Sequence, residues 1–174
     1  MAGFWKDANF EIKRSFKWVV IFGGTTGGTI PSFIASKVTK PSLSIGETEH
    51  NYLNHKFYYP GQVTWNDVSM TLVDPLEPDA ARLLLQRIKE GGYRPPENKN
   101  DLTTISKAKS VAQFSQIKIQ QLDANGTARE TWVLWNAWPK DVKFGDLDYS
   151  SEDMVNIELT FKYDYAWIDG LKQS

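Results

Sequence analysis

The chain has only two histidines, and two glutamates lie close to them in the sequence. The four residues are Glu47, Glu49, His50 and His55. Imidazole and carboxylate groups are ordinary ligands for divalent metals. Their spacing here matches no known ligand pattern, and there is no cysteine to complete a zinc site. We therefore interpret them as polar surface residues and expect neither a metal nor a cofactor.

A glycine-rich run follows an apolar stretch, which is the usual setting of a phosphate-binding loop. The run is Gly23-Gly24-Thr25-Thr26-Gly27-Gly28-Thr29. A phosphate-binding loop also requires Lys-Ser or Lys-Thr at a fixed offset and a helix that begins there, and the sequence indicates neither. The run is predicted to be a turn between strands. Since no histidine is placed to activate a serine, we also predict that the chain is not an enzyme.

Four carboxylates gather near the C-terminus around a Tyr-Ser-Ser turn. They are Asp146, Asp148, Glu152 and Asp153. Calcium loops carry oxygen ligands at regular spacing around a central glycine, whereas Gly145 precedes these carboxylates. We interpret the cluster as an acidic turn that faces solvent or a lumen.

Three tryptophans, Trp132, Trp135 and Trp138, have the chemistry of stacking platforms for nucleic-acid bases. They lie in or beside an expected strand without a set of basic groove residues, which favours packing in a core or at an interface. The net charge of −1 also argues against a basic nucleic-acid binder.

The charge is unevenly distributed along the chain. Residues 1–44 carry six Lys or Arg and two Asp or Glu, whereas residues 140–169 carry three and eight. In a self-assembling subunit this asymmetry would steer head-to-tail contacts. The alternative is chance solvation of two surface segments.

Composition indicates one folded domain over residues 1–174, with a core at about 10–168. Aromatic residues make up 13% of the chain and include seven tryptophans, which often signals a large buried interface. Without cysteine there are no disulfides. We expect no membrane span, because no apolar run approaches the required ~20 residues. The N-terminus lacks the apolar core of a secretory signal, so the protein is expected to stay in a cytosol unless a particle carries it out.

Alternating apolar residues predict several strands, and turn signals separate them. Asn125-Gly126 is a strong hairpin signal between two of them. The glycine-rich run is expected to join the first two strands into another hairpin. The expected strands are residues 15–23, 30–39, 62–73, 113–122, 127–137 and 155–164.

One helix is predicted over about 78–90, because acids and Pro78 open it and an apolar stripe follows. The stripe consists of Ala81, Leu84, Leu85 and Ile88. Residues 93–112 are expected to be a loop, with a short strand possible at its end. Residues 43–60 are too long for a simple connection and end in aromatics, so we interpret them as an extended hairpin arm. Since helices do not alternate with strands, the sequence predicts a mainly antiparallel β-sandwich or barrel with one flanking helix.

Several long segments resemble the tail tube proteins of T-even-like contractile-tailed bacteriophages. The stretch from His55 to Pro75, HKFYYPGQVTWNDVSMTLVDP, is similar to the centre of those proteins. The stretches Lys140–Ser150 and Tyr163–Trp167 are similar to their C-terminal end. The resemblance covers about residues 10–168, and matches least well at the glycine-rich run and after Trp167.

The resemblance implies two roughly orthogonal antiparallel sheets with a flanking helix and a long arm. It also implies hexameric rings, whose sheets join into an inner barrel and which stack into a tube. In a myovirus particle that tube lies inside a contractile sheath, is a structural part of the virion assembled in the bacterial cytoplasm, and serves genome ejection. The implied partners are further copies, the tail sheath protein, a baseplate tube-initiator, a tape-measure protein, a tail terminator and double-stranded DNA in transit without specific binding.

Two sets of residues are therefore candidates for function. We expect the arm to contact the next ring, and the bore to be electronegative because a basic wall would retain DNA. The arm candidates are Glu47, Glu49, Tyr52, Phe57, Tyr58 and Tyr59, and the lumen candidates are Asp146, Asp148 and Glu158. The alternatives are an inner tube subunit of a phage-derived injection or type VI secretion system that carries protein effectors, a baseplate tube-initiator, and a monomeric carbohydrate-binding sandwich.

Overall fold

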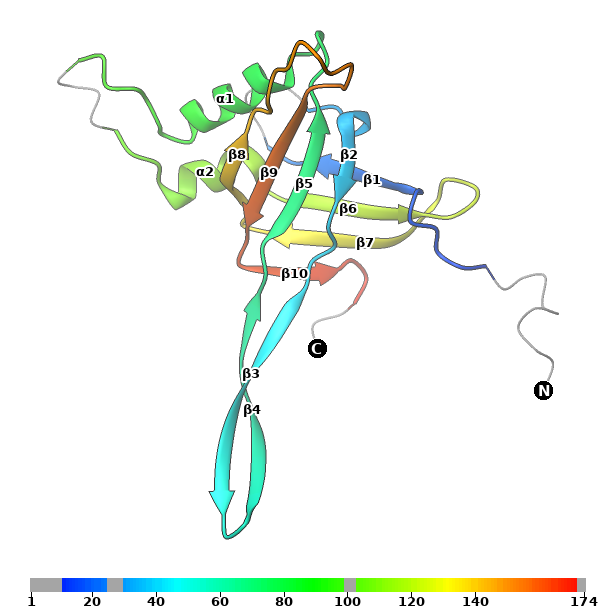
Figure 1. Ribbon diagram of the computed structural model, residues 1–174, viewed down its shortest axis with the longest axis vertical. Coiled ribbons are helices and arrows are strands. Elements are labelled where there is room, and N and C mark those ends of the chain that lie inside the picture. The colour runs from blue at the N-terminus through cyan, green and yellow to red at the C-terminus, as the bar shows by residue number, and fades with distance from the viewer. Residues whose placement is uncertain (1–10, 25–29, 99–102, 172–174) are drawn as a thin grey trace.

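The computed structural model describes residues 11–24, 30–98 and 103–171. Two four-stranded sheets, a two-stranded hairpin and two helices make up the described part of the chain (Figure 1). The strands are β1 (Trp18–Phe22), β2 (Ala35–Val38), β3 (Leu43–Tyr52), β4 (His55–Trp65), β5 (Val68–Val73), β6 (Ile117–Leu122), β7 (Ala128–Trp135), β8 (Trp138–Lys143), β9 (Asn156–Lys162) and β10 (Tyr165–Ile168). The helices are α1 (Ala80–Glu90) and α2 (Lys107–Phe114), and a 3₁₀ turn, η2 (Ser32–Ile34), precedes β2.

Both sheets are antiparallel throughout, as predicted. We call the sheet with strand order β1-β6-β7-β10 sheet A and the sheet with order β2-β5-β9-β8 sheet B. Their strands cross in Figure 1, and the β3–β4 hairpin projects beyond one end of sheet B. The resulting crossed sandwich agrees with the arrangement that the resemblance implies.

The core lies between the two sheets. The clean alternation predicted near the C-terminus is confirmed in β9, where the side chains at 157, 159 and 161 are buried and those at 156 and 158 are exposed. Phe161 packs against Phe22 and Phe114 with ring centroids 6.5 and 5.5 Å apart. The fully buried side chains include Val20, Ile117 and Leu134 from sheet A and Leu72, Ile157, Leu159 and Phe161 from sheet B.

The hairpin predicted between residues 15–23 and 30–39 is wrong. β1 pairs with β6 in sheet A, whereas β2 pairs with β5 in sheet B. The physical reason lies in the connection, because Ile30 and Ile34 are buried and carry the chain through the core from one sheet to the other. Residues 25–29 of the glycine-rich run lie outside the described part of the chain.

The strand predicted over 62–73 is two strands. β4 ends at Trp65 and β5 begins at Val68, so the break falls at Asn66-Asp67. The Asn66 side chain donates to the hydroxyls of Ser42 and Ser44, at 3.1 and 3.3 Å. This break is where the hairpin leaves sheet B.

The number of helices also differs from the prediction. The helix predicted at about 78–90 is confirmed as α1, with Asp79 accepting a hydrogen bond from the backbone N–H of Arg82 at 2.8 Å. The segment predicted as a loop over 93–112 contains the start of α2, whose N-cap is Ser106. α2 has eight residues, too few to show a helical period clearly in the sequence.

Arg87 is a buried cation that joins α1 to its surroundings. Its side chain is 2% exposed and donates to the carbonyls of Gly23 at 3.1 Å and Gln113 at 2.9 Å. The guanidinium also lies over the ring of Phe114, 5.4 Å from the centroid. Burial lowers the pKa of Arg87 below its ordinary value. The helix face therefore differs from the predicted stripe, because Arg87 points inward while Leu85 is 54% exposed.

Glu130 holds together three segments that are distant in the sequence. Its side chain, 12% exposed, pairs with Lys13 of the N-terminal segment and with Lys40 at 2.7 Å, just before β3. The indole N–H of Trp132 donates to the same carboxylate at 2.6 Å. The hydrogen bonds from Lys13 and Lys40 lower the pKa of Glu130 to about 2. The base of the hairpin is thus tied to sheet A through Lys40.

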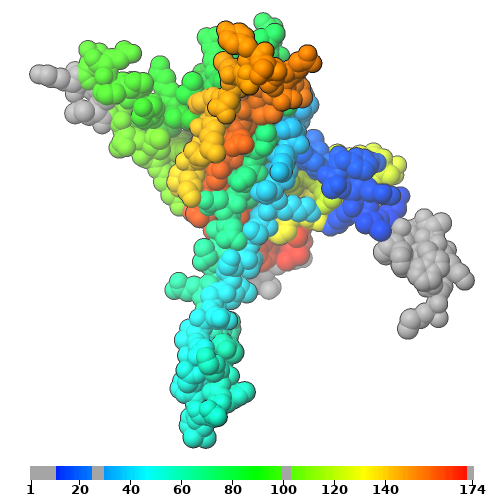
Figure 2. All heavy atoms as spheres, viewed as in Figure 1, coloured from blue at the N-terminus to red at the C-terminus, as the bar shows by residue number. Residues whose placement is uncertain are grey.

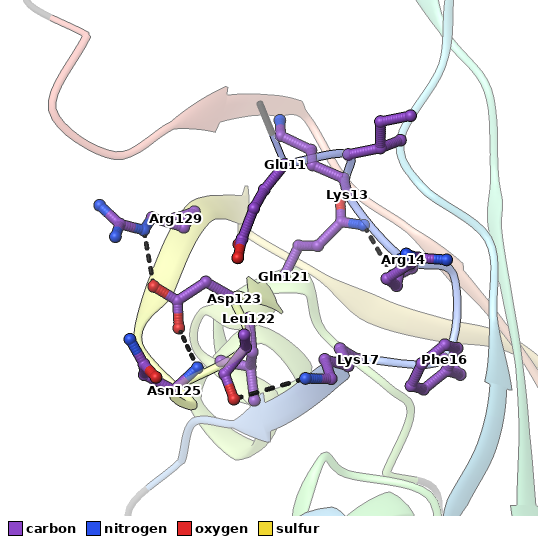
Figure 3. Close-up of a pocket in the computed structure, with 12 residues that line it drawn as sticks. Glu11, Lys13, Arg14, Phe16, Lys17, Gln121, Leu122, Asp123, Asn125 and Arg129 are labelled. Atoms are coloured by element: carbon purple, nitrogen blue, oxygen red, sulfur yellow. Dashed lines mark hydrogen bonds and ion pairs between the residues drawn. The ribbon is translucent and has the colours of Figure 1, made fainter. Parts of the chain in front are cut away.

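The N-terminal segment also borders an open cleft of about 820 Å³ beside the β6–β7 turn (Figure 3). The polar groups in it are largely paired with one another. Asp123 accepts from Arg129 Nε at 2.8 Å and from the backbone of Asn125 and Thr127, and Lys17 donates to the Ala124 carbonyl. The cleft therefore results from the docking of residues 11–17 on the β6–β7 hairpin. Among the residues that line it, no nucleophile contacts a base.

Arg87→Met should lower the free energy of unfolding by about 2 kcal/mol, because two buried carbonyls lose their charged donor. Lys89→Met, on the exposed side of the same helix, is the matched control and should change it by less than about 0.5 kcal/mol. Urea unfolding of the two variants measures the difference. Equal effects would contradict the role given to Arg87.

Glu130→Gln should lower the free energy of unfolding by about 1–2 kcal/mol at neutral pH. The folded-state pKa of Glu130 is depressed, so its contribution is complete above its ordinary pKa of 4.5 and is lost as the pH falls through about 2. The free energies of unfolding of the wild type and of Glu130→Gln should therefore converge as the pH falls from 5 to 2. A difference in free energy that stays constant across that range would exclude the ionised carboxylate as its cause. Glu158→Gln, which removes one charge from an exposed ion pair, is the control.

Candidate assembly surfaces

The β3–β4 hairpin is the predicted arm, and it is longer than predicted. It runs from Leu43 to Trp65 instead of ending near residue 60. All of β3 is exposed, and so is every residue of β4 except Trp65, whose ring lies 6.1 Å from that of buried Tyr163. Figure 2 shows the arm as a narrow projection from the body. A two-stranded hairpin without packing is marginal in water, so this segment needs a partner surface.

The strand register divides the arm into two faces, because paired residues share a face and successive residues alternate. His50 is opposite Phe57, and Tyr52 is opposite His55. The aromatic face, defined by Thr48, His50, Tyr52, His55, Phe57 and Tyr59, carries no carboxylate. The charged face is defined by Glu47, Glu49, Asn51, Lys56, Tyr58 and Pro60. The six predicted arm residues are thus split equally between the two faces.

The four residues considered as metal ligands are separated by the same register. His50 and His55 lie on the aromatic face, where the rings of His55 and Phe57 pack edge to face at 4.8 Å. Glu47 and Glu49 lie on the charged face, and Glu49 pairs with Lys56 at 3.1 Å. Among the residues that the structure describes, no group of three or more His, Cys, Asp or Glu is placed to hold a metal ion.

Glu158 lies on the outer face of sheet B, opposite the core. It pairs with Lys143 of β8 at 3.3 Å, and both side chains are mostly exposed. The rest of this outer face is mainly polar and of mixed charge, although Val73 and Trp138 share it by register. Its exposed or half-buried side chains include Lys37, Ser69, Thr71, Asp141, Lys143, Asn156, Glu158, Thr160 and Lys162. This mixture of charges differs from a uniformly acidic surface.

Asp146 and Asp148 lie apart from Glu158, in the loop that joins β8 to β9. We call residues 144–155 the acidic loop; it contains four carboxylates and no Lys, Arg or His. Asp148 accepts from the backbone N–H and the hydroxyl of Ser150, at 2.9 and 2.7 Å, and these bonds lower its pKa. The loop also exposes apolar side chains, namely Leu147, Tyr149 and Met154.

The outer face of sheet A carries several apolar side chains, although Lys118, Gln120 and Thr131 also lie on it. Ile21 is 42% exposed, and Trp135 and Tyr165 are each 37% exposed and stack on one another at 5.9 Å. Trp132 has the opposite orientation and packs against the core. The tryptophans are therefore divided between core and surface. None of the helices among the described residues has both the length and the apolar character needed to cross a membrane.

Sequence reasoning missed Glu130 and Lys40, which fix the base of the arm. Their pairing could not be recognised in the sequence, because 90 residues separate the two partners and neither belongs to a recognisable motif. Asp67 is a similar case, since it pairs with Lys140 at 2.7 Å and Lys162 at 2.8 Å across the end of sheet B. Hydrogen bonds from these two lysines lower the pKa of Asp67.

No protein-family model matches the chain, and no curated protein matches it in sequence. Solved structures are similar to it in fold. A chain in a cryo-EM structure of the sheath/tube terminator of an extracellular contractile injection system, PVC, has a TM-score of 0.66 at 19% identity and covers 93% of this chain and 99% of its own. A chain in the PVC sheath-tube complex has a TM-score of 0.64 at 19% identity, with coverage of 92% and 93%.

A chain in the tube-terminating cap of the anti-feeding prophage has a TM-score of 0.67 at 16% identity and covers 97% of this chain and 98% of its own. These similarities extend over nearly the whole of each chain. Identity this low establishes the fold alone. The chain shares the fold of these chains from the PVC injection system and the anti-feeding prophage.

Proposed function

We propose that this chain is the subunit of an inner tail tube, in which six copies form a ring and rings stack inside a contractile sheath. The observation that carries the proposal is the geometry of sheet B. It has four antiparallel strands, so its edge strands β2 and β8 run in opposite directions. When copies are rotated about an axis along the strands, β8 of one copy meets β2 of the next in antiparallel orientation. Neighbouring strands are then antiparallel all the way around a closed barrel, whatever the number of copies.

The two edges of sheet B are available for such pairing. Within the described part of the chain, each of β2 and β8 has one partner strand. Both edges carry features that limit unspecific pairing: a register shift beside Lys37 in β2, and a register shift next to Pro139 in β8. These features support pairing that is restricted to a correctly placed neighbour.

The two outer faces support an orientation of the subunit in the ring. The outer face of sheet B is mainly polar, with hydroxyl groups and ion pairs at Lys143 and Lys162, as a water-filled bore requires. The outer face of sheet A exposes Ile21, Trp135 and Tyr165, which suits contact with protein. We therefore propose that sheet B, with Glu158, faces the bore and that sheet A faces outward. The tail sheath protein is the partner expected on that outward side.

The arm is the proposed contact between rings. It projects along the direction of the sheet B strands, away from the body, and it is almost wholly exposed. A ten-residue strand spans about 33 Å, enough to reach over a neighbouring ring. At the ends of the tube the same surfaces would meet the baseplate tube-initiator and the tail terminator, and a tape-measure protein would occupy the growing bore.

Two cargoes are candidates. Double-stranded DNA follows from the resemblance to T-even-like tail tubes, which makes the chain a virion protein for genome ejection. A protein effector is the second candidate, favoured by the mixed charge on the outer face of sheet B. A basic wall would retain a polyanion, so the paired lysines at 143 and 162 must stay neutralised in a DNA conduit. Electron micrographs of the native particle, with or without a DNA-filled head, distinguish the two.

Replacement of residues 46–62 by Asn-Gly should leave rings intact and abolish stacked tubes. The design keeps the Ile45–Val63 pair and closes it with a two-residue turn. Because the removed segment is exposed, the free energy of unfolding should change by less than about 1 kcal/mol. Negative-stain microscopy on a baseplate template counts rings per tube. Long tubes formed by this variant would contradict the role of the arm, and absence of rings from the wild-type protein would contradict the tube proposal itself.

Glu158→Lys should slow DNA ejection by at least tenfold while tubes of normal length still assemble, because it leaves Lys143 unpaired and adds a second cation in each copy. The matched control is Gln86→Lys, which places the same charge on the exposed side of α1. Ejection is followed by dye fluorescence on released DNA. Normal ejection rates from Glu158→Lys particles would contradict the placement of Glu158 in the bore.

A further inference from the structure

The acidic loop and the arm lie at opposite ends of sheet B. β5 and β9 are neighbours, and the backbone N–H of Asp74, after β5, donates to the Val155 carbonyl at 2.9 Å, before β9. The acidic loop therefore leaves the end of sheet B that is remote from β4. In Figure 1 the arm points down and the loop between β8 and β9 is at the top. A copy displaced along the strand direction would bring its arm to the loop of the next copy.

The acidic loop has exposed apolar surface that the described part of the chain leaves uncovered. Leu147 is 88% exposed, Met154 is 70% exposed and Tyr149 is fully exposed. The loop keeps a defined shape through short-range hydrogen bonds, such as that from the Ser151 hydroxyl to Asp153 at 2.9 Å. Its base is close-packed, since a Cβ on Gly145 would lie 2.6 Å from the Asn156 carbonyl oxygen. A shaped loop that presents both apolar groups and carboxylates is suited to a binding partner.

The two faces of the arm differ in whether they complement this loop. The aromatic face offers apolar rings together with hydrogen-bond donors, namely the hydroxyls of Tyr52 and Tyr59 and the imidazoles of His50 and His55. The carboxylates of the loop are acceptors without a lysine or arginine of their own segment. The charged face of the arm carries Glu47 and Glu49 and one cation, Lys56, which already pairs with Glu49, so the net charge of this face is negative and the loop would repel it.

We infer that the aromatic face of the arm in one copy docks on the acidic loop of a second copy in the adjacent ring. This inference rests on the proposed stacking of rings and names the two surfaces that carry it. Tyr52, Phe57 and Tyr59 cover Leu147, Tyr149 and Met154, and the two imidazoles donate to carboxylates of the loop. The contact is heterologous, so it repeats along the tube without closing on itself.

His50→Glu is the test, with Asn51→Glu as its matched control. The two substitutions introduce the same carboxylate at adjacent positions, on the aromatic and the charged face respectively. His50→Glu should reduce the fraction of rings found in stacks at least tenfold, because it sets like charges against each other, whereas Asn51→Glu should change it by less than twofold. Stacking is measured by sedimentation and negative-stain microscopy on the same baseplate template.

A compensating change in the loop separates a specific contact from a general loss of stability. Asp146→Lys together with Glu152→Lys should weaken stacking alone and restore it, to within about threefold of wild type, when combined with His50→Glu. Equal effects of His50→Glu and Asn51→Glu, or no rescue, would overturn the inference while leaving the tube proposal in place. Absence of any stacks in the wild-type protein would overturn the tube proposal itself.

The lack of cysteine permits an independent, direct measurement. Tyr52→Cys combined with Tyr149→Cys should give ladders of covalently joined subunits when assembled tubes are treated with a short bis-maleimide. Asn51→Cys combined with Tyr149→Cys is the control for the opposite face and should give at most a tenth of that product. Equal ladders from both pairs would count against the assigned face.

Discussion

The edges of sheet B impose the constraint on which the rest of this fold depends. A strand at the edge of a sheet leaves one row of backbone N–H and C=O groups without a partner strand, and water must satisfy them. β2 and β8 both have such a row, and they run in opposite directions because the sheet has an even number of antiparallel strands. In the proposed ring, one repeated contact would satisfy both rows. An odd number of strands would have placed parallel neighbours at every junction.

Several polar side chains place the remaining elements around this sheet. Arg87 joins α1 to the end of β1 and to α2 by donating to two carbonyls. Glu130 joins the N-terminal segment and the approach to β3 to sheet A. Asp67 joins the break between arm and sheet to two lysines at the end of sheet B. Each of these groups contacts segments distant in sequence. Because hydrogen bonds and ion pairs are directional, each group specifies the orientation of one element relative to another more closely than apolar packing alone.

The parts of the fold that sequence reasoning predicted are those determined by local pattern. The alternation in β9, the Asn125-Gly126 turn and α1 depend on neighbours within one turn or one strand, and all three are present. The sequence pairs β2 with β1, whereas the structure pairs it with β5. The local pattern does not show that Ile30 and Ile34 are buried and carry the chain across the core to the other sheet. Arg87 was missed for the same reason: nothing near it in sequence shows that its donors meet carbonyls of Gly23 and Gln113. The arm was recognised by its length and polarity, but its two faces follow only from the register of β3 against β4.

The unlike ends of sheet B also bear on the polarity of an assembly. Two copies meeting through their acidic loops would bring together four carboxylates from each, in segments with no cation of their own. Like charges in contact across an interface cost several kcal/mol, so this arrangement is disfavoured. Two copies meeting arm to arm would leave the exposed Leu147, Tyr149 and Met154 of both copies uncovered. Head-to-tail contact is the arrangement that avoids the repulsion and covers the apolar side chains together, so a single chain with unlike ends is sufficient to build a tube of uniform direction.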